Sequence, residues 1–169
     1  MKISYSINLT PLAPTPTPRP EKFVEYSYNE FWLDLPEHWK QYPAPDKNTL
    51  NWHSEKEGAS IIVSVQYFAT PKEKWEELAN VIIQSRLDVH EDQYPGQVEV
   101  LHRSVKPHSG GEGLEISYAA EAAADTVFIF LGYVTSRKIL NLQMVCKPDR
   151  HEAARLFNNT MRKFSAKLP

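Results

Sequence analysis

The first clear alternation of apolar and polar residues lies at residues 31–36, FWLDLP. Every second residue of this stretch is apolar: Phe31, Leu33 and Leu35. This period of two predicts a strand with one buried face, and it places Trp32 and Asp34 on the opposite face. Pro36 has no N–H to donate to a neighbouring strand, so we expect the strand to end there.

Two further apolar stretches predict a hairpin. They are residues 49–54 (TLNWHS) and 59–68 (ASIIVSVQYF), with the polar turn EKEG between them. The second stretch carries β-branched residues at both odd and even positions. Because β-branched residues favour strands, we expect residues 59–68 to lie centrally in the sheet.

A helix is predicted from Pro71 to about His90. Thr70, Pro71 and Glu73 have the spacing of a capping box with proline at the first helical position. The following residues form a stripe with three- and four-residue spacing: Trp75, Leu78, Ala79, Ile82 and Arg86. Arg86 is the only polar member of this stripe, so we expect the stripe to pack on the sheet.

Later stretches predict the rest of the sheet and a second helix. The strand candidates are residues 97–106, 113–122, 126–135 and 138–146, separated by short turns. Short connections favour antiparallel neighbours. A last amphipathic helix is predicted over residues 148–164, with one apolar stripe: Ala153, Leu156, Phe157, Thr160, Met161 and Phe164.

This order, β-β-β-α-β-β-β-β-α, predicts an α+β fold. We expect a mostly antiparallel sheet of six to seven strands with the two amphipathic helices packed on it. The sequence PLAPTPTPRP has five prolines in ten residues, which favours an extended conformation. Residues 1–25 are therefore interpreted as a proline-rich arm, and residues 26–169 as a single domain of ordinary size.

Charge and cysteine content narrow the function classes. The formal net charge of −2 gives no long-range attraction to nucleic acid or to an anionic membrane surface. Cys146 is the only cysteine, so no disulfide can form within the chain, which is typical of a reducing compartment. We find no apolar segment typical of a signal peptide or a membrane span. We expect a cytoplasmic protein.

No motif in the sequence predicts catalysis. The histidines, at 38, 53, 90, 102, 108 and 151, have no metal-ligand spacing, and His90 is interpreted as part of a polar helix end. The glycine-rich segment 109–113 lacks the lysine and the following helix of a phosphate-binding loop. No serine stands next to an evident base. We therefore expect no enzyme activity, no metal site and no cofactor.

Aromatic residues are the remaining candidates for function. Core packing is the simplest interpretation of these residues, but tryptophan and tyrosine are also favoured at protein interfaces. The candidate partner-binding residues are Trp32, Trp39, Trp52, Tyr67, Tyr118 and Tyr133.

Several segments resemble the PsbP-like and DcrB-like domain family. They are Leu35-Pro36-Glu37-His38-Trp39, ASIIVSVQ within 59–66, GLEISY at 113–118, and the MRKFS sequence that ends the last helix. The resemblance covers about residues 26–166 and implies a PsbP-like sandwich. Members are mostly non-enzymatic and include photosystem extrinsic subunits, a nuclear-transport GTPase-binding protein, lipoproteins, and the Eag-type chaperones of type VI secretion.

The sequence leaves three functional hypotheses. In its layout the chain is most similar to the cytosolic Eag-type branch, which implies a homodimeric chaperone or adaptor whose sheet face binds an apolar segment of a secreted effector. The alternative is a small-molecule or ion-binding module with a pocket between sheet and helix, lined by residues such as Trp39, Trp52 and Tyr118. A cryptic enzyme is a third, less favoured hypothesis.

Overall fold

The structure is a computed structural model that describes residues 21–147, 149–161 and 164–167. The elements, in chain order, are β1 (Phe23–Ser27), β2 (Phe31–Pro36), β3 (Lys40–Tyr42), β4 (Thr49–Ser54), β5 (Ala59–Tyr67), the 3-10 turn η1 (Lys72–Lys74), α1 (Trp75–Gln93), β6 (Val98–Pro107), β7 (Leu114–Ala122), β8 (Thr126–Val134), β9 (Lys138–Cys146), α2 (Arg150–Met161) and β10 (Phe164–Ala166).

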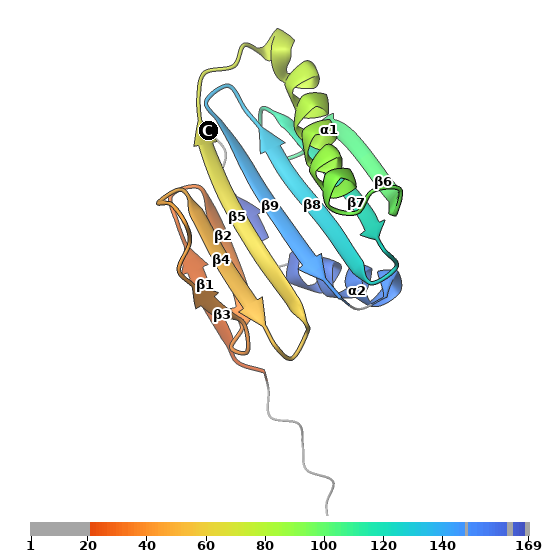
Figure 1. Cartoon of the computed structure of the whole chain (residues 1–169). Helices are drawn as coiled ribbons and strands as arrows, with labels where there is room; N and C mark the ends of the chain where they lie inside the picture. The colour runs from red at the N-terminus through yellow and green to blue at the C-terminus, as the bar shows by residue number, and fades with distance from the viewer. Residues whose placement is uncertain (1–20, 148, 162–163, 168–169) are drawn as a thin grey trace, which may run out of the picture.

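The strands form two antiparallel sheets. The large sheet has seven strands in the order β3-β4-β5-β9-β8-β7-β6, and the small sheet has three in the order β1-β2-β10. Helix α1 covers β6, β7 and β8 on one side of the large sheet, while α2 lies on the other side (Figure 1). We call these the α1 side and the α2 side. The α1 side of β3, β4 and β5 carries no helix, as Figure 1 shows.

A separate core fills each side of the large sheet. On the α2 side, the small sheet and α2 pack on alternate residues of β4, β5, β8 and β9, including Trp52, Ile61 and Leu142. On the α1 side, α1 packs on β7 and β8 through residues such as Ile83 and Phe130. Strands β8 and β9 are covered on both sides over much of their length, which explains their nearly continuous apolar sequences.

The predicted α+β class is confirmed, as are the hairpin 49–68 and the four later strands. Phe31, Leu33 and Leu35 are buried as predicted, but their strand belongs to the small sheet rather than to the main one. The structure adds β1, the short edge strand β3, and β10. Phe164 was expected on the last helix, yet it pairs with Leu33 in β10 because α2 ends at Met161.

The first helix starts and ends differently from the prediction. Pro71 is the residue that precedes η1, and no side chain caps either η1 or α1, so the predicted capping box is wrong. Thr70 instead accepts a hydrogen bond at its backbone oxygen from Trp75 Nε1, at 3.0 Å. The helix continues to Gln93, and His90 is buried rather than part of a solvated end.

The domain boundary differs by a few residues. Strand β1 begins at Phe23, so residues 23–25, which we assigned to the arm, form part of the small sheet. The remainder of the predicted proline-rich arm, residues 1–20, lies outside the described residues. No helix of the part of the chain that the structure describes is long and apolar enough to cross a membrane.

Gly113, the residue before β7, should be the least replaceable glycine of the described chain. Its φ is +136°, and an added Cβ would lie 2.6 Å from the backbone oxygen of Val134. We expect Gly113→Ala to lower the free energy of unfolding by at least about 2 kcal/mol, because the backbone cannot move aside. Urea unfolding would measure this change.

Gly110→Ala is the matched control in the same connection. A Cβ at residue 110 would meet the ring of His108, a side chain that can rotate away, and Gly110 has no unusual φ. This variant should cost less than about 1 kcal/mol. Equal losses in the two variants would contradict the explanation.

Candidate functional site

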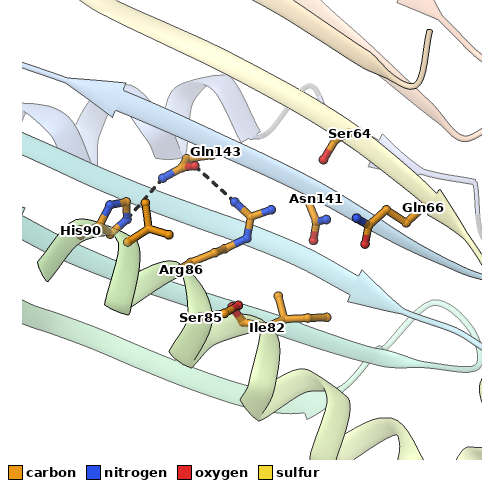
Figure 2. Close-up of a pocket in the computed structure, with 9 residues that line it drawn as sticks. Ser64, Gln66, Ile82, Ser85, Arg86, His90, Asn141 and Gln143 are labelled. Atoms are coloured by element: carbon orange, nitrogen blue, oxygen red, sulfur yellow. Dashed lines mark hydrogen bonds between the residues drawn. The ribbon is translucent and has the colours of Figure 1, made fainter. Parts of the chain in front are cut away.

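A cleft of about 330 Å³ lies where α1 leaves the large sheet uncovered. We call it the α1–β9 cleft. It is lined from α1 and from the facing strands β5 and β9, as Figure 2 shows. The lining residues are Ser64, Gln66, Ile82, Ser85, Arg86, Val89, His90, Asn141 and Gln143.

The alternation of β5 and β9 explains why this wall is polar. Residues that pair across antiparallel strands share a face, and Ser64 pairs with Asn141. The neighbouring residues along each strand, such as Val63 and Leu142, point to the α2 side and are buried in the core there. Both strands therefore have an apolar α2 side and, at the cleft, a polar α1 side.

Gly132 of β8 shapes the floor beside the cleft. It pairs with Asn141, and a Cβ at residue 132 would lie 2.9 Å from atoms of Ile116 and Phe130. The ring of Phe130 can therefore lie close to the strand only because residue 132 has no side chain. This ring supports Arg86, whose Cζ atom lies 4.5 Å from the ring centroid.

Arg86 is the one permanently charged residue of the lining. Its Nη1 donates a hydrogen bond to Gln143 Oε1 at 3.3 Å. No ion pair between Arg86 and a carboxylate occurs within the described residues. Burial lowers the pKa of the guanidinium below its usual value. In Figure 2 the guanidinium extends from α1 toward Gln143 and Asn141.

His90 closes one end of the cleft in a buried polar network. Its Nε2 lies 2.7 Å from the Tyr118 hydroxyl, and Gln143 Nε2 donates to the same hydroxyl at 3.3 Å. The His90 ring stacks on Phe128 with centroids 3.8 Å apart. Burial, helped by the charge of Arg86, lowers the pKa of His90 to about 4, so the ring is neutral at pH 7. Burial also raises the pKa of Tyr118 to about 12.

Two buried polar atoms of the lining lack a partner among the described residues. They are Nδ1 of His90 and Oδ1 of Asn141. Buried polar groups are nearly always hydrogen-bonded, and an exception often marks a place where a ligand or water binds. Asn141 is buried on the sheet wall of the cleft. Its amide oxygen is therefore the group of that wall that a ligand could supply with a hydrogen bond.

The other large cleft, about 340 Å³ between the small sheet, α2 and the β4–β5 turn, has a different character. It contains both acidic and basic groups, and several of them pair with one another. His38 lies 3.2 Å from Glu21 and 3.4 Å from Glu57, and Lys56 lies 3.9 Å from Glu21. Basic side chains of this cleft thus lie within 3.9 Å of carboxylates, whereas no described carboxylate lies that close to Arg86.

The structure separates the six predicted partner-binding residues. Trp39, Trp52 and Tyr133 lie in the core on the α2 side, and Tyr118 lies under α1. Trp32 is 44% exposed on the small sheet, with Lys167 Nζ 4.2 Å from its ring centroid. Tyr67 is 59% exposed, and its hydroxyl donates to Glu30. Contact of these residues with a partner stays a prediction.

The alternative hypothesis placed a pocket between sheet and helix, but none of the three residues named for its lining lines the α1–β9 cleft. Trp39 and Trp52 face the α2 side, and Tyr118 supports the cleft from below through His90 and Gln143. The sequence contained two signals that we did not combine: the polar member of the α1 stripe, Arg86, and the polar positions inside otherwise apolar strands. Within the described residues, no cluster of three His, Cys, Asp or Glu side chains is arranged to hold a metal ion.

Comparison with known proteins supports the fold. No family model matches this sequence, and no curated protein sequence matches it. The solved structure of cyanobacterial PsbP (CyanoP) from Synechocystis sp. PCC 6803 is similar, with a TM-score of 0.62 at 12% identity, over 94% of this chain and 100% of that chain. A protein of Bacteroides thetaiotaomicron VPI-5482 has a TM-score of 0.43 at 8% identity, over 82% of this chain and 45% of that chain. The first likeness shows a PsbP-like fold, and the second adds nothing to it.

Proposed function

We propose that this chain, which has a PsbP-like fold, is a non-enzymatic binding protein that holds a small polar ligand in the α1–β9 cleft. The observation that carries the proposal is the composition of the cleft wall: hydroxyl, amide and guanidinium groups converge there, and a buried amide oxygen lacks a partner. Ligand sites combine a concave shape with a few convergent polar groups, and this cleft lies at the small end of their usual size.

The groups of the cleft favour binding over catalysis. No carboxylate is part of the lining, and Ser85 donates its hydroxyl proton to the backbone oxygen of Ile82 rather than to a base. His90, the only side chain of the lining that titrates near neutral pH in water, is held neutral and engaged with Tyr118. A general base and an activated nucleophile are the usual requirements for hydrolytic chemistry.

The uncovered face of the large sheet is less suited to an apolar protein segment. Among the described residues of β3, β4 and β5 that lie on this face, Tyr42 and Ile62 are the large, apolar and exposed ones. Their neighbours there are polar: Asn51, His53, Ser60, Ser64 and Gln66. The hypothesis of a cytoplasmic, homodimeric type VI secretion chaperone, or of a DcrB-like protein, therefore stays a prediction. Trp32, exposed on the small sheet, is the residue that favours it.

A filled-cleft variant tests the ligand proposal. Ser64→Phe would place a ring inside the α1–β9 cleft, whereas Ser60→Phe adds the same ring on the same face of β5 but outside the lining. We expect small polar compounds to raise the melting temperature of the wild type and of Ser60→Phe, because a ligand that binds only the native state stabilises it. Ser64→Phe should show no such rise.

The melting temperatures would be measured by thermal shift with a library of polar fragments. Hits would then be located by ¹⁵N chemical shifts of the cleft residues. A library that stabilises Ser64→Phe and the wild type equally would place the binding site elsewhere and contradict the proposal.

A further inference from the structure

The charge of the α1–β9 cleft indicates the class of its ligand. Arg86 is half-buried, and within the described residues Gln143 Oε1 is the one acceptor of a hydrogen bond from its several N–H groups. Stacking on Phe130 compensates part of the lost hydration but brings no negative charge. A half-buried cation without a carboxylate is stabilised by any anion that reaches it.

The acidic groups nearest in sequence are engaged elsewhere. Asp88 Oδ1 accepts a hydrogen bond from Gln84 at 2.9 Å, and Glu91 Oε1 accepts one from the backbone N–H of Gly96 at 2.6 Å. Neither residue lines the cleft. The positive charge of Arg86 is therefore not neutralised from its own helix.

The other polar groups of the cleft are neutral. Ser64 and Gln66 face it from β5, and Asn141 and Gln143 face it from β9. His90 stays uncharged at pH 7, as described above. The lining thus carries one formal positive charge together with groups that donate or accept hydrogen bonds.

We infer that the ligand of the α1–β9 cleft is a small organic monocarboxylate, held by its carboxylate on the guanidinium of Arg86 and by its polar remainder on Asn141 and Ser64. This inference rests on the proposed function. The planar fork of arginine matches the geometry of a carboxylate. A single cation balances a single negative charge, whereas a phosphate dianion would keep one charge without a partner in a partly desolvated site.

The unpartnered oxygen of Asn141 supports a ligand with a hydroxyl group as well. An amide at this position can accept from a ligand hydroxyl through Oδ1, or donate to the ligand through its N–H groups. Hydroxycarboxylates offer both functions at once, within the modest volume of about 330 Å³.

The test compares acids with their amides on the intact protein. The probes are acetate, lactate and gluconate, each beside its neutral amide, together with inorganic phosphate. Binding would be followed by ¹⁵N chemical shifts of the cleft residues. We expect at least one carboxylate to bind ten-fold or more tightly than its amide and more tightly than phosphate.

Two variants and a control locate the preference at Arg86. Arg86→Gln should abolish the preference for acid over amide, and Arg86→Lys should keep it with several-fold weaker binding. Arg103→Gln is the control, because Arg103 is exposed and bonds Gln84 and Asn80 of α1 away from the cleft. It should leave the affinity unchanged. Arg86→Lys also keeps the test usable if Arg86→Gln fails to fold.

Each contrary outcome has a defined meaning. Equal binding of acid and amide, an unchanged preference in Arg86→Gln, or tighter binding of phosphate overturns the monocarboxylate inference while the cleft remains a binding site. Binding of the neutral amides alone has the same meaning. If none of the seven probes shifts a cleft resonance and the fragment library also fails, the proposed function falls together with the inference.

Discussion

Lowering the pH from 7 to 4 is expected to remove about 3 kcal/mol of stability through His90 alone. The ring is buried under α1, and its pKa falls from the ordinary value of 6.5 to about 4. Between these two values the unfolded chain binds a proton at residue 90 and the native protein does not. Stability therefore falls as the pH drops through this range, and the loss levels off below about pH 4.

Among the described residues, the groups around His90 include no negative charge that would offset the burial of a protonated ring. The ring contacts Phe128, Tyr118 and Gln143, and the nearby charged group is Arg86, which also disfavours a proton on the ring. None of these groups carries the negative charge that would offset burial of an imidazolium. Carboxylates elsewhere in the protein also titrate in this range, so the measurement needs a variant as its reference.

His90→Gln is that reference, because glutamine retains a hydrogen-bonding side chain but does not titrate. Urea unfolding of both proteins from pH 7.5 to 4 would give two stability curves. The difference between the curves should change by about 3 kcal/mol across this range, whatever the stability of the variant at pH 7. Parallel curves would show that His90 has the same pKa in the native and the unfolded protein, and would contradict the prediction.

Replacement of Trp52 by alanine is expected to lower the free energy of unfolding by about 3–5 kcal/mol. Trp52 is 1% exposed in the core between the two sheets, and its ring lies edge-on to Tyr26 with centroids 5.2 Å apart. The alanine would leave a cavity that strands fixed in a ladder cannot close.

Two control variants separate burial from residue type. Trp52 Nε1 is buried without a hydrogen-bond partner in the described chain, so Trp52→Phe removes a costly N–H group and should cost less than about 1.5 kcal/mol. Trp32→Ala removes a half-exposed ring that makes a cation–π contact with Lys167, and it should cost about 1 kcal/mol or less. If Trp32→Ala proved as harmful as Trp52→Ala, the assignment of the core would be wrong.

Periodicity along the chain was sufficient to predict most of the fold. Strands such as β5 and β8 have patterns that depend only on which faces are covered, so local sequence predicts them. The small sheet was harder, because β10 has three residues and forms only by pairing with β2, far away in sequence. Phe164 fits a helical stripe equally well, and long-range pairing decides between the two.

The residues of the cleft could not be predicted from the sequence. A pocket between sheet and helix was the alternative hypothesis, and aromatic residues were chosen for its lining. Whether a tryptophan faces α1 or the core on the α2 side depends on the register of its strand. A shift of the register by one residue moves the side chain to the opposite face of the sheet. The end of α1 depended on burial of His90 against Phe128, and nothing in the residues around His90 signals that contact.

Strand β9 serves as the wall of the cleft on one side and as the floor of a packed core on the other. Asn141 and Gln143 face the cleft, while Leu140, Leu142 and Met144 are anchored on the α2 side. A wall backed in this way cannot shift freely, and Gln143 is held in addition by its hydrogen bonds with Arg86 and Tyr118, so we expect the wall to be ordered before any ligand arrives. Binding should then cost little conformational entropy and proceed in a single step, with a rate that rises linearly with ligand concentration.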